Sequence, residues 1–173
     1  GRGTADHFGL TEETDIIMST FSKSLASLGG FMAADQYVVD YVKHNSRPFI
    51  FSASIPPACC AAALAALRVI RREPERVARL TDLAAYMRKG LKAIGAPVKE
   101  SSHLTPIIPF YTYEPEATLL KAKQLYEAGV YLNPVLPPAA PTGQCLLRTS
   151  LMASHTYELL DDAIGIIGEV INA

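Results

Sequence analysis

Residues 16–34 read IIMSTFSKSLASLGGFMAA, two apolar runs separated by a loop that is rich in hydroxyl side chains. The first run predicts a short buried strand at 15–20, and the second, which opens with paired glycines, predicts another strand at 30–34. This arrangement places Lys23 just beyond the end of the first strand. Hydroxyl groups lie on both sides of the lysine, at Thr20, Ser22, Ser24 and Ser27.

A lysine in such a loop suits one kind of chemistry. Its amine can form a Schiff base with the aldehyde of pyridoxal phosphate, while neighbouring hydroxyls hold the phosphate. The same residues also fit a solvated lysine in a serine-rich turn, and the local motif alone favours that alternative. The interpretation of the loop therefore depends on the rest of the sequence.

Five sequence blocks, in order along nearly the whole chain, resemble the α-oxoamine synthases, a branch of the fold-type I, class II aminotransferase-like enzymes that use pyridoxal phosphate. The blocks are GRGTADHFG at 1–9, TFSK at 20–23, SRPFIFSASIPP at 46–57, TPIIP at 105–109 and LRTSLMASHT at 147–156. The resemblance implies an α/β fold, the C-terminal part of such a transferase. Residues 1–57 would be the C-terminal portion of the cofactor-binding large domain, 58–95 long connecting helices, and 96–173 a small C-terminal α/β domain.

The hydrophobic pattern independently predicts alternating strands and helices. Strands are expected at 15–20, 30–34, 49–53, 106–113, 130–133 and 145–151. Helices are expected at 36–44, 58–72, 76–94, 116–128 and 157–171. His7, His44 and His103 are interpreted as surface or loop residues.

Composition narrows the class of protein. About half of the 173 residues are hydrophobic (49%), and the formal net charge is −1. No basic face is evident, which argues against a nucleic-acid partner. The longest apolar stretch, 55–67, is too short to span a bilayer, so no transmembrane segment is expected. Cys59, Cys60 and Cys145 have no metal-ligand spacing, and we expect them to be reduced core residues of a cytoplasmic protein.

The resemblance assigns roles to the residues of the lysine loop. Lys23 would be the Schiff-base lysine and a proton-transfer group, and Thr20 would face the cofactor. Ser22 is assigned to the cofactor as well, although strand alternation could turn it away. Ser52 falls where the family has a hydroxyl that reaches the cofactor phosphate of the neighbouring subunit, which implies a homodimer. The alternative for Ser52 is a strand-end hydroxyl bonded to backbone.

Arg148 is the candidate for holding the carboxylate of an amino-acid substrate, because a guanidinium group is always charged and matches a carboxylate bidentately. It lies inside the apolar run Leu146-Leu147-Arg148, where an unpaired charge would be costly. A structural aspartate or glutamate partner is the alternative. No role is assigned to Arg47, and His155 is expected to be structural.

The resemblance implies a decarboxylative condensation of an amino acid with an acyl-CoA. The blocks around Lys23 and at 46–57 favour the serine-using branch. Alanine with pimeloyl-CoA, or glycine with acetyl-CoA or succinyl-CoA, are the alternatives, although glycine-using members typically have glycine where this chain has Ser22. The chain starts without Met in what would be the middle of the catalytic domain, so we expect it to be inactive by itself. A non-catalytic fragment or a scaffolding subunit is the alternative of another class, and Lys23 argues against the scaffolding role.

Overall fold

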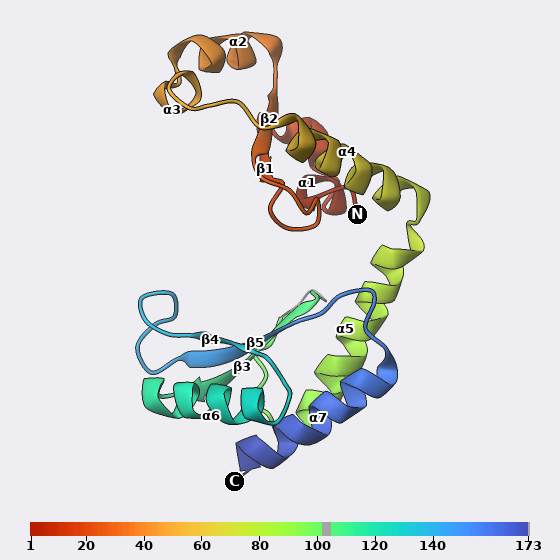
Figure 1. The fold of residues 1–173 in the computed structure, drawn as a ribbon, viewed down its shortest axis with the longest axis vertical. Helices are drawn as coiled ribbons and strands as arrows, with labels where there is room; N and C mark the ends of the chain where they lie inside the picture. Colours follow the sequence, from red (N-terminus) through yellow and green to blue (C-terminus); the bar gives the residue numbers. More distant parts are fainter. Residues whose placement is uncertain (102–104, 173) are drawn as a thin grey trace. The chain divides into compact units, whose positions relative to one another are not determined.

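The computed structural model describes residues 1–101 and 105–172, and the chain divides into two compact units, residues 1–74 and 75–173 (Figure 1). Within these residues, the first unit has an antiparallel sheet of two strands and the second an antiparallel sheet of three. His103 lies outside the described residues. None of the helices formed by the described residues is both long and apolar enough to cross a bilayer.

The first unit is organised around a two-stranded hairpin. Strand β1 (Ile16–Thr20) pairs with β2 (Gly30–Ala34), and the register runs from Ile16 opposite Ala34 to Thr20 opposite Gly30. Both strands lie where the sequence predicts them, but the prediction that the first is buried is wrong, because Ile16 and Met18 are exposed. The other elements of the unit are α1 (Thr4–His7), a 3₁₀ turn η1 (Thr11–Glu13), α2 (Gln36–Asn45), α3 (Arg47–Ile50) and α4 (Pro57–Arg72).

The strand predicted at 49–53 is wrong, because the chain there forms the short helix α3 and then a turn. Pro48 lies in the first turn of that helix, where its fixed φ suits the helix and its missing N–H costs nothing. The N–H of Phe51 donates to the carbonyl of Arg47 at 2.9 Å. The aromatic and β-branched residues that favoured a strand are instead exposed, and Ser52 lies in an exposed turn rather than at a strand end.

The first unit has almost no core of its own. All of its residues are described, and among them Ala63 alone is buried. Large apolar side chains such as Met18 (72% exposed) and Leu28 (64%) remain open to solvent. The prediction that all three cysteines are core residues is therefore wrong for Cys60, which is exposed because α4 buries so little, whereas Cys145 of the second unit is buried. A two-stranded hairpin with so few buried side chains is only marginally stable by itself.

The second unit is an α/β layer structure. It consists of α5 (Glu75–Ala93), β3 (Ile107–Tyr113), α6 (Pro115–Glu127), β4 (Asn133–Val135), β5 (Cys145–Ser150) and α7 (Tyr157–Asn172). The strand order is β3-β5-β4, so β5 is central and antiparallel to both neighbours. All the predicted helices of both units are found within about two residues of their expected bounds.

Strand β4 begins later than predicted, at Asn133 rather than Val130. The backbone explains the shift. Gly129 adopts φ +94°, and its N–H donates to the carbonyl of Tyr126, while the N–H of Val130 donates to the carbonyl of Leu125. These bonds are typical of a helix C-terminus that ends in a left-handed glycine, so Val130 belongs to the exit from α6. Strand β4 is an edge strand, and Pro134 in its middle lies opposite Leu147 of the central strand β5.

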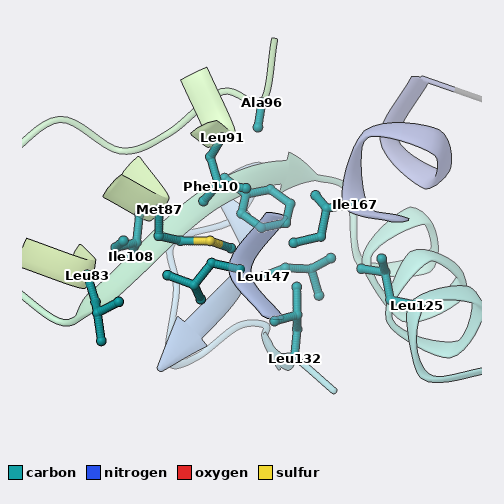
Figure 2. Packing of buried hydrophobic residues seen from close by; sticks show 11 residues of the cluster. Leu83, Met87, Leu91, Ala96, Ile108, Phe110, Leu125, Leu132, Leu147 and Ile167 are labelled. Atoms are coloured by element: carbon teal, nitrogen blue, oxygen red, sulfur yellow. The ribbon is translucent and has the colours of Figure 1, made fainter. Parts of the chain in front are cut away.

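The core of the second unit lies between one face of its sheet and the helices (Figure 2). Side chains of β5 alternate: those of Cys145, Leu147 and Thr149 are buried, whereas Leu146 and Arg148 are half-buried on the other face. Figure 2 shows Leu147 among the other members of the core. These members come from the helices, the strands and the segments between them: Leu83, Met87, Leu91, Ala96, Ile108, Phe110, Leu125, Leu132, Leu160 and Ile167.

Because Leu147 and Leu146 lie on opposite faces of β5, we expect their replacement by alanine to destabilise the fold to different extents. We expect Leu147→Ala to lower the free energy of unfolding by about 2–5 kcal/mol, because it removes a fully buried side chain and leaves a cavity. Leu146→Ala removes the same atoms from the half-buried face and serves as the matched control. Urea unfolding of the 173-residue chain, followed by circular dichroism, measures both values. Equal losses for the two variants would contradict the assignment of faces.

Candidate functional site

The lysine loop, residues 21–29, connects β1 to β2 and is closed by its own backbone. The N–H of Phe21 donates to the carbonyl of Gly29 at 2.8 Å, and the N–H of Ser27 donates to the carbonyl of Phe21 at 2.9 Å. Inside this closure the N–H of Ala26 donates to the carbonyl of Lys23 at 3.0 Å. Lys23 is thus held in a tight loop while its side chain stays exposed.

The paired glycines at the end of the loop permit close approach of neighbouring segments. Gly29 has φ +105°, a conformation that favours glycine, and a Cβ there would lie 2.6 Å from Cδ1 of Ile55. A Cβ on Gly30 would lie 2.7 Å from the carbonyl oxygen of Ser19. Side chains at these two positions would therefore push the loop away from β1 and from the segment that precedes α4.

Two side-chain contacts fix the loop to its surroundings. The hydroxyl of Ser27 donates to the carbonyl of Cys59, in the first turn of α4, at 2.6 Å. The rings of Phe21 and Phe31 stack with centroids 6.0 Å apart. The loop is consequently braced both on α4 and on β2.

The hydroxyls of Thr20 and Ser22 meet beside the loop. Ser22 Oγ lies 3.2 Å from Thr20 Oγ1 and donates to it, and both residues are exposed. The two hydroxyls that the sequence assigned to the cofactor therefore lie side by side. An exposed primary amine within three residues of a hydroxyl pair is a donor set that can hold an aldehyde cofactor with a phosphate group.

A pocket of about 500 Å³ lies between the hairpin and α2 of the first unit. Thr20 lies in its wall together with mainly apolar residues, among them Phe31, Val42 and Phe49, and Lys43 supplies a cation. Lys23 does not line this pocket. The pocket is therefore part of the surroundings of β1 and not the lysine site itself.

The remaining candidates lie elsewhere in the chain. Ser52 occupies the exposed turn after α3, and Arg148 belongs to the second unit. His155, two residues before α7, accepts at Nδ1 from the N–H of Met152 at 3.4 Å, which closes a turn and supports a structural role. Arg79 of α5 donates to the carbonyls of Ala153 and His155 at 2.8 and 2.9 Å and holds the same turn.

Arg148 lies at the centre of the sheet face that is opposite the core. Its cross-strand neighbours are Pro109 of β3 and Asn133 of β4. Arg148 Nε is buried but has no hydrogen-bond partner, and no ion pair of Arg148 occurs among the described residues. The structural aspartate or glutamate that the sequence left as an alternative is thus not found in that part of the chain.

Sequence reasoning missed Asn133, which the register places directly opposite Arg148. No local motif marks this asparagine. Its relation to Arg148 depends on the antiparallel pairing of β4 with β5, and the sequence prediction placed the strand three residues too early.

Comparison with protein families finds a match of residues 1–167 to the model for aminotransferase class I and II. Serine palmitoyltransferase of Bacteroides thetaiotaomicron is 47% identical over 95% of this chain and 41% of its own length. The 8-amino-7-oxononanoate synthase of Thermosipho melanesiensis is 39% identical over the same shares. The chain thus spans about two fifths of the length of these curated relatives.

Solved structures give the same picture of the fold. A serine palmitoyltransferase of Sphingomonas wittichii has a TM-score of 0.93 at 29% identity, over 99% of this chain and 43% of that chain. A serine palmitoyltransferase from S. paucimobilis, solved with bound PLP–myriocin aldimine, has a TM-score of 0.92 at 30% identity over the same shares. The fold class expected from the resemblance, a part of a fold-type I transferase, is confirmed.

The bond between Ser27 and α4 predicts how firmly the loop is held. Ser27→Ala should raise the rate of tryptic cleavage after the exposed Lys23 by about fivefold, because one intramolecular hydrogen bond contributes on the order of 1 kcal/mol against local opening. Limited trypsinolysis of the 173-residue chain with peptide mapping measures this rate. Ser54→Ala, an exposed serine shortly before α4, is the matched control. An unchanged rate in Ser27→Ala would show that the bond does not brace the loop.

Proposed function

The chain belongs to the aminotransferase class I and II family, and from that premise we propose that the protein containing it is a pyridoxal-phosphate-dependent α-oxoamine synthase. Such an enzyme condenses an amino acid with an acyl-CoA and releases carbon dioxide and free CoA. The relatives named serine palmitoyltransferase and 8-amino-7-oxononanoate synthase support this reaction class. Because the chain spans about two fifths of their length, the proposal concerns the full-length protein.

The lysine loop is the observation on which the proposal rests. We assign two roles to Lys23: its Nζ would hold pyridoxal phosphate covalently, and the same amine would move a proton during the reaction. Thr20 and Ser22 are assigned to the oxygen atoms of the cofactor, since their hydroxyls meet 3.2 Å apart. The closed backbone of the loop would hold Lys23 in one place. The cofactor, when bound, supplies the electron sink for the carbanion.

Arg148 is assigned to the α-carboxylate of the amino-acid substrate. Arg148 is half-buried on the sheet face opposite the core, its Nε is buried, and it has no anionic partner among the described residues. A partly desolvated guanidinium binds a carboxylate more strongly than an exposed one does, because water screens the charges less.

Serine is the favoured amino acid and a long-chain acyl-CoA the favoured acyl donor. Sequence identity does not separate serine from alanine, since serine palmitoyltransferase of Bacteroides thetaiotaomicron is 47% identical and a putative 8-amino-7-oxononanoate synthase 2 of Mycobacterium tuberculosis is 46% identical. The preference for serine rests on the blocks around Lys23 and at 46–57. Ser22, immediately before Lys23, also disfavours the glycine-using branch. Alanine with pimeloyl-CoA remains the second candidate because the relatives named 8-amino-7-oxononanoate synthase match the same part of the chain.

We further propose that residues 1–57 belong to the cofactor-binding large domain, 58–95 to connecting helices and 96–173 to the small domain. The first unit buries almost nothing by itself, which supports its being one part of a larger sheet domain. For the same reason we propose that the 173-residue chain alone is inactive. A purely scaffolding role is disfavoured by the presence of Lys23.

The attachment of the cofactor can be tested directly. Pyridoxal phosphate is added to the full-length protein, the adduct is reduced with borohydride, and the labelled peptide is mapped by mass spectrometry. We expect the label on Lys23, because this amine is exposed beside the hydroxyl pair. Lys23→Arg should abolish the label, whereas Lys43→Arg, a neighbouring lysine of α2, should retain it. A label that persists in Lys23→Arg would contradict the proposal.

The proposed dimer makes a separate prediction through Ser52. We propose that this exposed hydroxyl reaches the cofactor phosphate bound in the partner subunit. When Ser52→Ala chains are mixed with Lys23→Ala chains, both lesions should then fall on one site of each hybrid dimer. The other site stays intact, with the wild-type affinity for the cofactor. Fluorescence titration of purified hybrids measures this affinity, and hybrids without any wild-type site would show that Ser52 acts within its own chain.

A further inference from the structure

We propose that Asn133 is a positioning residue for Arg148, whose carboxamide oxygen accepts the Nε–H of the guanidinium group when Arg148 binds a substrate carboxylate. The inference rests on the proposed function, because it assumes that Arg148 takes an amino acid by its carboxylate. It adds a residue of another strand, Asn133, which would help to bind the substrate by orienting Arg148.

The sheet register puts the two side chains together. Asn133 of β4 lies directly opposite Arg148 of β5, and directly opposite residues of an antiparallel pair project from the same face. Their Cβ atoms are therefore roughly 4.5–5.5 Å apart. Both side chains are half-buried on the face that does not contact the core. This separation lets a carboxamide reach the inner end of a guanidinium group.

Arg148 needs an acceptor at this place. Its Nε is shielded from solvent and has no hydrogen-bond partner among the described residues. A buried donor without a partner is costly, and few remain unpaired in native proteins. The other cross-strand neighbour, Pro109, has no side-chain acceptor. Asn133 is thus the directly opposite residue that can supply one.

The register sets no acidic residue beside Arg148 on this face. On β3, β4 and β5 the other residues of the face are Ile107, Tyr111, Val135, Leu146 and Ser150, none of which is acidic or basic. The bridge between Val98 and Phe110 adds Lys99 beyond Pro109, and this cation does not compete with a carboxylate for Arg148. A bond from Nε–H to the neutral Asn133 oxygen leaves the full positive charge for the ligand. The two terminal nitrogens of the guanidinium group are then directed outward, where they can bind both oxygens of a carboxylate. An acid at position 133 would instead pair with Arg148 and compete with the substrate.

Binding of L-serine to the full-length, cofactor-loaded protein provides the test. The dissociation constant is read from the change in the visible absorbance of the cofactor, which reports binding without turnover. We expect Asn133→Ala to weaken serine binding by roughly 10- to 100-fold, the range for a hydrogen bond to a charged group. Asn133→Asp should weaken it further, because the new carboxylate occupies Arg148.

A double-mutant cycle separates positioning from a general loss of structure. In an Arg148→Ala background, Asn133→Ala should change serine affinity by less than about twofold, since its effect passes through Arg148. Val135→Ala, on the same face two residues along β4, is the matched control and should leave serine affinity unchanged. The affinity for pyridoxal phosphate and the thermal unfolding midpoint should be the same in all variants.

The other outcomes of these measurements distinguish failure of the inference about Asn133 from failure of the proposed function. If Arg148→Ala weakens serine binding but Asn133→Ala and Asn133→Asp do not, the inference about Asn133 is wrong and the proposed function stands. Additive losses in the cycle would likewise overturn it. If wild-type protein shows no response to serine, alanine or glycine, the proposed function fails, and the inference fails with it. Should Asn133→Ala not fold, Asn133→Asp, which preserves the side-chain shape, decides the question.

Discussion

Strand β5 has a partner on each side, and this constraint organises the second unit. Pairing with β3 and β4 fixes the alternation of its side chains, so that Leu147 is buried in the core while Arg148 lies on the opposite face. A shift of one residue would bury the guanidinium group and expose the leucine. Such a change of register would strongly destabilise the folded unit. Burial of Leu147 in the core therefore fixes Arg148 on the opposite face of the sheet, although the core does not contact Arg148.

The lysine loop is held by a different means. The first unit buries little apolar surface, so the loop is shaped by backbone closure, by two glycines that allow close approach, and by the Ser27 bond to α4. Local hydrogen bonds of this kind keep a nine-residue connection compact without a core beneath it. Because no core covers the loop, Lys23 and its neighbouring hydroxyls stay exposed and accessible to a ligand.

Much of this arrangement could be predicted from the sequence, and the failures have physical causes. Strands β1 and β2 follow from short apolar runs, and the long helices follow from apolar residues at helical spacing and from the glycine or proline at several of their ends. The segment at 49–53 has strand-like composition, but Pro48 favours a helical turn and none of the described strands pairs with this segment. Asn133 could not be found because its importance depends on which strands pair, a long-range property that local patterns do not contain.

Both edges of the three-stranded sheet in the second unit are protected against pairing with another strand. The outer edge of β3 is covered by the segment at 97–99: the carbonyl of Pro109 accepts from the N–H of Lys99, and the N–H of Tyr111 donates to the carbonyl of Pro97. On the other edge, β4 has only three residues, and Pro134 in its middle lacks an N–H donor. An incoming strand would find few unpaired donors at either border. The small sheet is thus protected against edge-to-edge aggregation, a protection that the uncovered hairpin of the first unit does not share.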